Sequence, residues 1–230
     1  YVTSFNDLTR LREVEMMKSD FVSMVSHELR TPLTSIKGAL TLLDMMAGKA
    51  LPDNQKQLLG IAFENCENLV KLVSDILDFE KVSRNEITYQ MERQDMGTLV
   101  EKAVAITQPY ANQFNVRYVV SKDDAELPVH ADHPRLVQVI VNLLSNAAKF
   151  SHAGSDVTVS ARADGASVEV LVTDRGIGIP ETSQAKIFQR FSQVDHGSRP
   201  TKVKGTGLGL SIAKMMVEAH GGSIGFRSTE

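Results

Sequence analysis

The segment Ser26–Leu33, read as Ser-His-Glu-Leu-Arg-Thr-Pro-Leu, places several reactive residue types side by side. Residues of a helix are ~100° apart around its axis, which puts His27 roughly 160° from the middle of the apolar stripe of this region. The imidazole is therefore expected to face solvent, with Glu28 beside it and Thr31 one turn further on the same side. Such an imidazole can act as a nucleophile, and Pro32 is expected to kink the helix there. An ordinary surface histidine on an amphipathic helix is the alternative interpretation.

A second group of polar residues lies on the predicted helix from Leu136 to Phe150. Asn146 and Lys149 fall within about 40° of Asn142 around this helix, while leucine, isoleucine and alanine side chains occupy the opposite side. Asparagine oxygens can ligate a hard cation such as Mg²⁺, and a lysine can meet phosphate. The alternative is a helix whose polar side simply faces water.

Asp174–Pro180 follows a predicted strand and contains Gly176 and Gly178. A carboxylate at a strand end accepts hydrogen bonds, for example from the exocyclic amine of adenine. The two glycines let the backbone pass close to a ligand. By itself this stretch is also typical of a simple turn.

A second glycine-rich stretch opens a predicted helix, and its glycines are Gly205, Gly207 and Gly209. The free N–H groups and the dipole of a helix N-terminus favour phosphate. The spacing is neither the dinucleotide fingerprint nor a P-loop. Phe188 and Phe191 precede this stretch, with polar residues 193–204 between, which predicts a mobile lid carrying two aromatic anchors.

Two long helices are expected to position the His27 segment. The first carries a coiled-coil seam from Val14 to Met24 and ends near Met46, and the second, capped by Asp53, carries a seam from Leu58 to Phe79. A short loop between them predicts an antiparallel hairpin. One apolar seam per helix leaves the core of a single hairpin incomplete. A dimeric four-helix bundle, formed by two chains, completes it.

Strands and helices are mixed beyond residue 86. Strands are predicted at 87–91, 116–120, 157–161, 168–172 and 223–227. Helices are predicted after Asp95, ending before Pro109, after Asp132, and from the second glycine-rich stretch to Ala219. Elements in this order favour an α/β sandwich with helices on one face of the sheet.

Together these motifs resemble the transmitter region of a sensor histidine kinase, over about residues 18–230. Ser26–Leu33 is similar to the phosphoacceptor box of that family. The other matches are to its asparagine box (138–150), first glycine box (174–180), phenylalanine box (187–191) and second glycine box (205–210). This chain has Arg175 where asparagine is usual, Gln189 where glutamate is common and Lys204 where a further glycine is common.

The resemblance implies a dimerisation and phosphotransfer hairpin followed by an ATP-binding domain of the GHKL type. It assigns His27 as phosphoacceptor, Glu28 as its base and Thr31 as the residue that orients water for phosphatase action. Thr31 bonding its own helix backbone beside Pro32 is the alternative.

For the nucleotide domain the resemblance implies binding of ATP and Mg²⁺. Asn142 would ligate Mg²⁺, Asn146 and Lys149 would contact phosphates, and Asp174 would read adenine. The remaining nucleotide-binding positions implied are Gly176, Gly178, Phe188, Phe191, Gly205, Gly207 and Gly209.

The implied domains are residues 1–18, 19–86 and 87–230. The first is a signalling linker helix with the tail of an upstream PAS-type sensor domain, the second the phosphotransfer domain and the third the catalytic ATP-binding domain. The expected function is autophosphorylation of His27 and transfer to an aspartate of a response regulator, with phosphatase activity on it. A non-catalytic dimeric scaffold and an ATPase-driven conformational machine are the alternatives.

Composition limits the choice of partners. The chain has a net charge of −3 and no basic block, so no nucleic-acid binding is expected. No apolar run approaches the ~18 residues of a membrane span, and no signal peptide opens the chain. A cytoplasmic location without direct membrane contact is therefore expected, with room for an anchor upstream of Tyr1. Cys66, the single cysteine, is expected to pack in a core.

Overall fold

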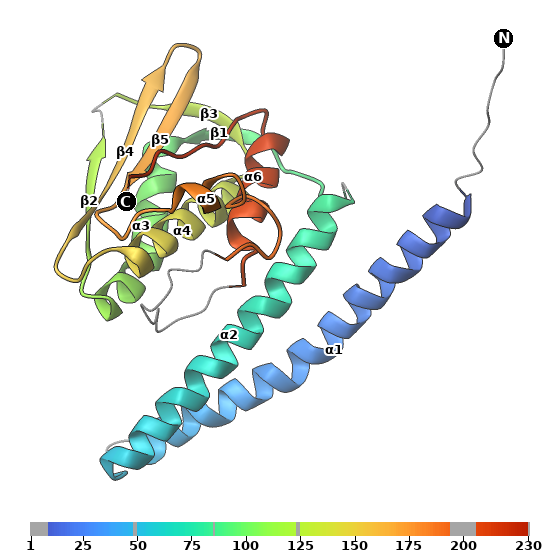
Figure 1. The fold of residues 1–230 in the computed structure, drawn as a ribbon, viewed down its shortest axis with the longest axis vertical. Helices are drawn as coiled ribbons and strands as arrows, with labels where there is room; N and C mark the ends of the chain where they lie inside the picture. The colour runs from blue at the N-terminus through green and yellow to red at the C-terminus, as the bar shows by residue number, and fades with distance from the viewer. Residues whose placement is uncertain (1–8, 48–49, 85, 123–124, 194–205, 230) are drawn as a thin grey trace. The chain divides into compact units, whose positions relative to one another are not determined.

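The computed structural model describes residues 9–47, 50–84, 86–122, 125–193 and 206–229, without the side chains of 9–23, 27 and 122. Residues 1–8 of the expected linker region lie outside this part of the chain, as do the seam side chains Val14, Met17 and Phe21. The chain divides into two compact units, Tyr1–Arg84 and Asn85–Glu230 (Figure 1). Within the described part of the chain, no helix is long and apolar enough to cross a membrane.

The first unit is a hairpin of α1 (Thr9–Ala47) and α2 (Asp53–Ser83). α1 continues through Pro32. The cap expected at Asp53 is wrong: Pro52 holds the N-cap position, and its carbonyl accepts from the N–H groups of Gln55 and Lys56. Asp53 is instead an acidic residue of the first turn, where a negative charge interacts favourably with the positive end of the helix dipole.

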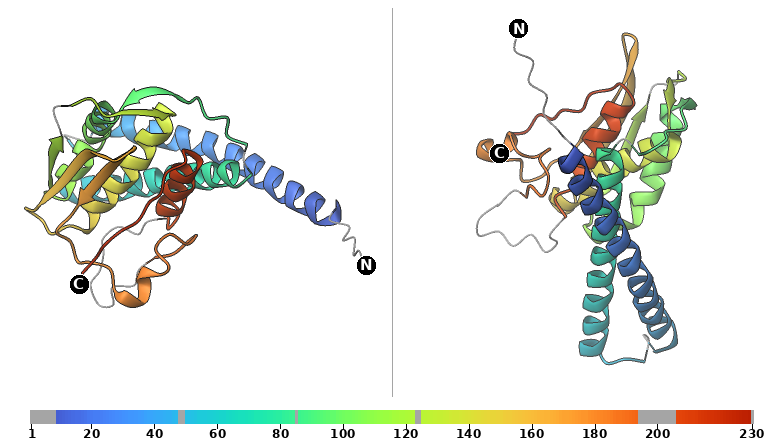
Figure 2. Two further views of the ribbon diagram at one scale, coloured as in Figure 1. Left: turned by 90° about the horizontal axis from the view of Figure 1, so that it is seen from above. Right: turned by 90° about the vertical axis from the view of Figure 1, so that its right-hand side faces the viewer.

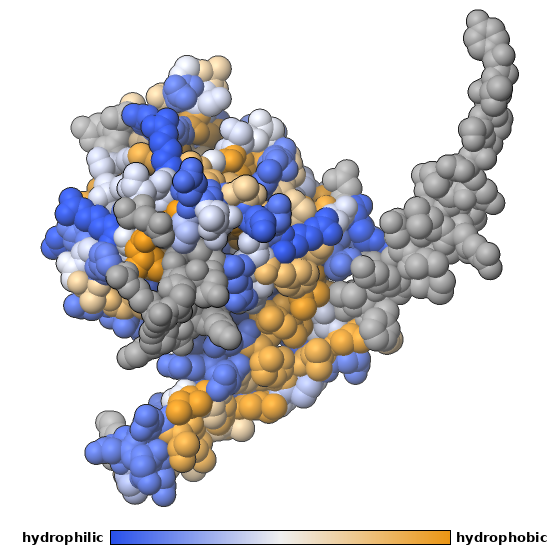
Figure 3. Space-filling view, in the orientation of Figure 1, coloured by the Kyte–Doolittle hydropathy of each residue, from blue (hydrophilic) through white to orange (hydrophobic). Residues whose placement is uncertain are grey.

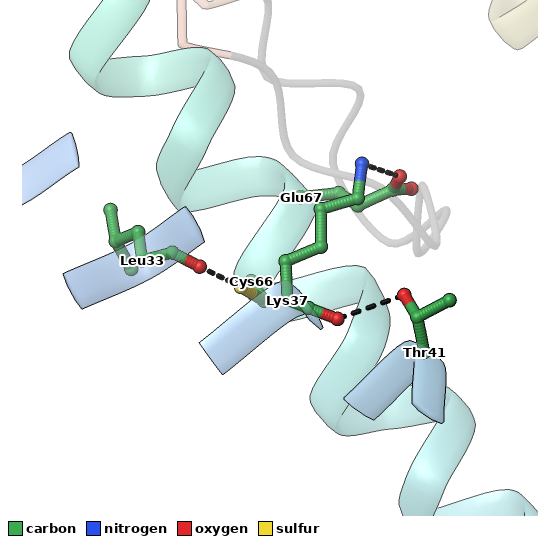
Figure 4. A network of polar contacts seen from close by, with 5 residues as sticks. All are labelled: Leu33, Lys37, Thr41, Cys66 and Glu67. Carbon is green, nitrogen blue, oxygen red and sulfur yellow. Dashed lines mark hydrogen bonds and ion pairs between the residues drawn. The ribbon is translucent and has the colours of Figure 1, made fainter. Parts of the chain in front are cut away.

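Polar contacts join α1 to α2 near the middle of the hairpin (Figure 4). Cys66 is buried, as expected, and its Sγ donates to the carbonyl of Leu33 at 3.4 Å. Lys37 forms an ion pair of 2.8 Å with Glu67, while the Thr41 hydroxyl donates to the Lys37 carbonyl at 2.8 Å. The Cys66–Leu33 and Lys37–Glu67 contacts hold α2 against α1 beside the buried thiol, while the Thr41 bond lies within α1.

In the second unit the sheets contain the following strands: β1 (Glu92–Asp95), β2 (Arg117–Lys122), β3 (Pro128–Ala131), β4 (Asp156–Asp164) and β5 (Ser167–Thr173). β1 pairs antiparallel with β3, while the other sheet has the order β2-β4-β5, parallel then antiparallel. β3 was not predicted from the sequence. The strand expected at 87–91 is wrong: these residues form no strand, and β1 begins at Glu92, where it pairs with the four-residue β3.

The second unit also contains four described helices: α3 (Met96–Gln113), α4 (His133–Phe150), α5 (Glu181–Gln184) and α6 (Gly209–Ala219). The expected end of α3 before Pro109 is wrong. The rings of Tyr110 and Phe114 pack at a tilt of 56° with centroids 4.9 Å apart, and Ala111 is fully buried, so packing outweighs the backbone hydrogen bond that proline removes.

α3 and α4 cover one face of the β2-β4-β5 sheet (Figure 2). Along β4, Val157 and Val159 are fully buried while Thr158 on the opposite face is exposed, so the sheet has one covered side. The largest fully buried side chains of the core that these elements share are Leu99, Val100, Leu144, Val157 and Val159. This confirms the predicted sandwich with helices on one face.

The strand expected at 223–227 is absent among the described residues, which follow α6 as an irregular tail. A strand needs a backbone partner, and side chains hold this tail instead. The Ser228 hydroxyl accepts from the N–H of Ile179 at 2.9 Å, and the rings of Phe226 and Phe188 lie 6.1 Å apart. The tail therefore supports the first glycine-rich stretch without extending the sheet.

Candidate nucleotide and phosphoacceptor sites

α4 presents the predicted polar ribbon at the edge of the core. Its N-terminus is capped by Asp132, whose Oδ1 accepts from the N–H of Arg135 at 3.1 Å. Asn142, Asn146 and Lys149 are all half-buried on this helix, while Ile140 and Leu144 are buried on its other side. The ribbon is therefore neither sealed in the core nor a freely solvated face.

The N-terminus of α6 lies against this ribbon. The Nδ2 of Asn142 donates to the carbonyl of Gly209 at 3.4 Å, and a Cβ at Gly209 would lie 3.7 Å from the amide carbon of Asn142. Among the described residues no side chain caps this end of α6. Its first N–H groups are thus the kind of donors that bind phosphate oxygens.

Asp174 is exposed and follows directly after β5. Its Oδ1 accepts from the N–H of Gly176 at 2.9 Å, which leaves Oδ2 for another donor. A Cβ at Gly176 would lie 2.5 Å from the Phe150 carbonyl oxygen, so only glycine fits there. This close approach connects the end of the polar helix to the first glycine-rich stretch.

Backbone contacts extend this connection between the end of α4 and residues 175–177. Ser151 and Gly176 form an isolated antiparallel bridge, and the N–H of Ile177 donates to the Phe150 carbonyl at 3.3 Å. Within the described residues, the Ser151 Oγ is buried and has no hydrogen-bond partner. Sequence reasoning missed Ser151. The available signal was a hydroxyl residue that follows Lys149 of the ribbon by two positions. An orphaned buried hydroxyl on the residue that bridges to Gly176 suits a site that takes a polar ligand.

The phenylalanine segment packs in two different ways. Phe188 is half-buried, with the Lys214 ammonium 5.8 Å from its ring centroid. Phe191 is 65% exposed and has a φ of 56°, so the expectation of two aromatic anchors is wrong for Phe191 in this structure. Instead the backbone of Phe191 packs on Gly207, where a Cβ would lie 2.8 Å from the Phe191 carbonyl carbon. Gly205 and residues 194–204 of the expected lid lie outside the described residues.

The expected phosphoacceptor residues lie in the middle of α1. Glu28 and Thr31 are exposed, whereas the His27 side chain is outside the described part of the structure. Thr34 and Ser35, just beyond Pro32, donate to the carbonyls of Arg30 and Thr31 at 2.8 and 3.2 Å. The surface next to His27 is therefore open along at least one side of the helix.

The donor set limits how a metal could be held. No group of three or more His, Cys, Asp or Glu side chains within the described residues could hold a metal ion. A cation at the α4–α6 junction would therefore rely on amide oxygen, water and the ligand's own phosphates, which suits Mg²⁺. The half-buried ribbon, the uncapped helix end and the orphaned Ser151 hydroxyl all fit a nucleotide.

Comparison with known families matches both units. Residues 17–85 match the family described as His Kinase A (phospho-acceptor) domain. Residues 131–230 match the family described as histidine kinase-, DNA gyrase B-, and HSP90-like ATPase. The chain thus combines a phospho-acceptor domain with an ATP-binding domain of the GHKL type.

Individual relatives carry both parts. The circadian input-output histidine kinase CikA of Synechococcus elongatus is 35% identical over 92% of this chain and 28% of its own length. The sensor histidine kinase WalK of Bacillus subtilis is 35% identical over 97% of this chain and 36% of its own length. Among solved structures, full-length ShkA in complex with AMPPNP matches with a TM-score of 0.69 and 28% identity, over 88% of this chain and 41% of that protein.

This chain belongs to the sensor histidine kinases and constitutes their transmitter region. It spans only about a third of the length of the two curated relatives named above.

Proposed function

We propose that this chain is the kinase core of a two-component sensor, which transfers the γ-phosphoryl group of ATP to His27 and then to an aspartate of a response regulator. The observation that carries this proposal is the junction of Asn142 with Gly209 at the uncapped start of α6. That junction lies in one unit of the chain, while the phosphoacceptor segment lies in the other.

The base and the phosphates of ATP would bind at different ends of the α4 ribbon. The free Oδ2 of Asp174 would accept from the exocyclic amine of adenine, with the Ser151 hydroxyl nearby to bond a ring nitrogen or a bridging water. The phosphates would lie over the first turn of α6, within reach of Asn146 and Lys149. Gly176 would allow the base to approach the backbone closely.

Mg²⁺ would be held by the amide oxygen of Asn142 together with phosphate oxygens. When bound, it neutralises charge that develops on the transferred phosphoryl group. Asn142 can serve this role because its Nδ2 already donates to Gly209, which turns its Oδ1 away from that contact.

The chemical step needs positioning more than covalent assistance. A neutral ring nitrogen of His27 attacks the γ-phosphorus as the bond from that phosphorus to the bridging oxygen breaks and ADP leaves. Glu28 accepts a hydrogen bond from the other ring nitrogen and stabilises the positive charge that forms there. The histidine–phosphorus bond later breaks when an aspartate carboxylate of the receiver domain attacks the same phosphorus.

Apolar side chains that one hairpin leaves exposed support a homodimer (Figure 3). Cys66, which contacts Leu33 of α1, is buried, as are Val73 and Leu77 of α2. Much of the seam expected from the sequence stays exposed in the single chain, although Phe79 is buried; the exposed members are Leu29, Ile36, Leu43, Leu58, Leu69 and Leu72. An apolar patch over residues 29–43 of α1 and 58–72 of α2 is typical of an interface, and a second hairpin would cover it.

The receiver domain of a response regulator would dock beside His27. Thr31 is exposed one turn further along α1, so its hydroxyl can orient water at a docked aspartyl phosphate. This position fits phosphatase action on the same partner.

The test is incubation of the chain with γ-labelled ATP, Mg²⁺ and a panel of receiver domains. The proposal expects label on the chain first and then on one receiver domain. Steady ATP turnover without labelled protein would favour an ATPase-driven machine instead, and absence of ATP binding would favour a scaffold.

A further inference from the structure

His220, at the C-terminal end of α6, contacts two other segments of its unit. Its Nδ1 donates to the Met216 carbonyl at 2.7 Å, and its Nε2 accepts from the backbone N–H of Asp132 at 3.0 Å. Both ring nitrogens are thereby used, which requires the neutral tautomer with the proton on Nδ1. The second bond has nothing to do with capping α6, because Asp132 is the N-cap of α4.

Residues 86–91, which lead from the hairpin into the second unit, join the same cluster. The ring of Tyr89 meets the His220 ring edge-on, with centroids 5.3 Å apart. The N–H of Gln90 donates to Asp132 Oδ2 at 2.9 Å. We call the set Tyr89, Gln90, Asp132 and His220 the histidine clasp.

The histidine clasp is only partly buried: Tyr89 and His220 are half-buried, and Gln90 is exposed. Asp132 is 5% exposed, and burial raises the pKa of Tyr89, opposed by the nearby Arg135 guanidinium. Within the described residues the Tyr89 hydroxyl is buried without a hydrogen-bond partner. Tyr89 therefore contributes its ring rather than its hydroxyl to the clasp.

α4 and α6 contact each other at two places, and the distance between these places is similar along both helices. From Asp132 to Asn142 α4 rises roughly 15 Å, and from Gly209 to His220 α6 rises roughly 16 Å, at ~1.5 Å per residue. The clasp joins the start of α4 to the end of α6, while the Asn142–Gly209 contact joins the middle of α4 to the start of α6. The helices are thus antiparallel, with the proposed phosphate site at the end opposite His220.

We propose that His220 is a positioning residue of the nucleotide site, which holds α6 against the cap of α4 and so sets the spacing between Asn142 and Gly209. This inference rests on the proposed function, since that function places phosphates at this junction. If His220 only capped the end of α6, the bond from its Nδ1 to the Met216 carbonyl would be sufficient. The bond from Asp132 to Nε2 is the one that serves positioning.

Two conservative variants separate these roles. In His220→Gln the side-chain amide reaches the position of Nε2 and can still accept from Asp132, whereas in His220→Asn it reaches the position of Nδ1 and can still bond Met216. The proposal expects His220→Asn to raise the Kd for ADP with Mg²⁺, and the KM for ATP, roughly three- to tenfold, with kcat unchanged. His220→Gln should stay within about twofold of the wild type. His130→Gln, an exposed histidine on β3, is the matched control.

Calorimetric titration of the whole chain with ADP and Mg²⁺ measures the Kd, and thermal melting shows that each variant folds. A purely structural role would lower melting temperature and kcat while leaving KM unchanged, and that result would overturn the proposal. If His220→Asn does not fold, a folded His220→Gln that loses affinity tenfold or more would overturn it equally. A wild-type chain that fails to bind ADP would instead refute the proposed function.

Discussion

Asn142 on α4 and Gly209 at the start of α6 are 67 residues apart in sequence and joined by a hydrogen bond of 3.4 Å. The amide group of Asn142 therefore lies at the end of a helix whose first turn no described side chain caps. A polar side chain that can ligate Mg²⁺ and a set of N–H donors that can bind phosphate thus share one place. The predictions below depend on that arrangement and on the hairpin that carries His27.

Asn142→Ala should weaken the Mg²⁺-dependent part of ATP binding. Loss of a contact to a charged group costs about 1.5–3 kcal/mol, or roughly 10- to 100-fold in Kd. Calorimetry with and without Mg²⁺ gives both affinities. Asn112→Ala, at an exposed asparagine near the end of α3, should bind ATP like the wild type. An Asn142→Ala variant with the wild-type Mg²⁺ dependence would mean that the cation is held elsewhere.

Gly207→Ala should impair nucleotide binding more than a matched glycine replacement. Gly207 and Gly165 both have positive φ, 71° and 59°, so alanine at either should cost roughly 1–2 kcal/mol of unfolding free energy. Only at Gly207 does a Cβ also meet another segment, the backbone of Phe191 at 2.8 Å. We expect at least a ~3-fold higher Kd for ATP in Gly207→Ala and an unchanged Kd in Gly165→Ala. Equal affinities in the two variants would separate Gly207 from the site.

Leu69→Glu should convert the dimer to monomers. Leu69 is 49% exposed in one chain, but in the proposed bundle its carboxylate replacement would be buried at a cost of several kcal/mol. Lys71→Glu places the same group at an exposed position roughly 160° around α2 and should leave the dimer intact. Sedimentation velocity distinguishes the two states. A well-folded wild-type monomer would refute the dimer itself.

Thr31→Ala should keep autokinase activity and slow removal of phosphate from the phosphorylated response regulator. The hydroxyl is not needed for attack on ATP, where His27 is the nucleophile, but it can orient the attacking water. Dephosphorylation is measured with the kinase supplied with ADP. A structural role beside Pro32 would instead lower both activities together with the melting temperature of the hairpin.

The sequence predicted the elements whose signals are local. α4 combines an Asp132 cap with a regular apolar face, and the β4–β5 hairpin combines strict alternation with an Asp-Gly turn. The polar ribbon of α4 lies where helical spacing placed it. Local patterns were sufficient here because the packing of each element agrees with its own propensity.

Errors arose where a distant contact decides the structure. The length of β1 depends on β3, and the tail after α6 lacks a strand because Ser228 and Phe226 hold it by side chains. His220 gave no pattern in the sequence, because Asp132 and Tyr89, which it contacts, lie on other segments. Pro109 stays within α3 for the same reason, since aromatic packing at Tyr110 outweighs its local effect.

The most direct test compares phosphate incorporation from γ-labelled ATP in the wild-type chain, in His27→Gln and in His130→Gln as an exposed-histidine control. The account predicts label that is lost in acid and kept in base, as expected of a phosphoramidate, in the wild type and the control. His27→Gln should bind ATP with unchanged affinity but incorporate no labelled phosphate. Acid-stable label, or label on His27→Gln, would contradict the central claim that His27 is the phosphoacceptor.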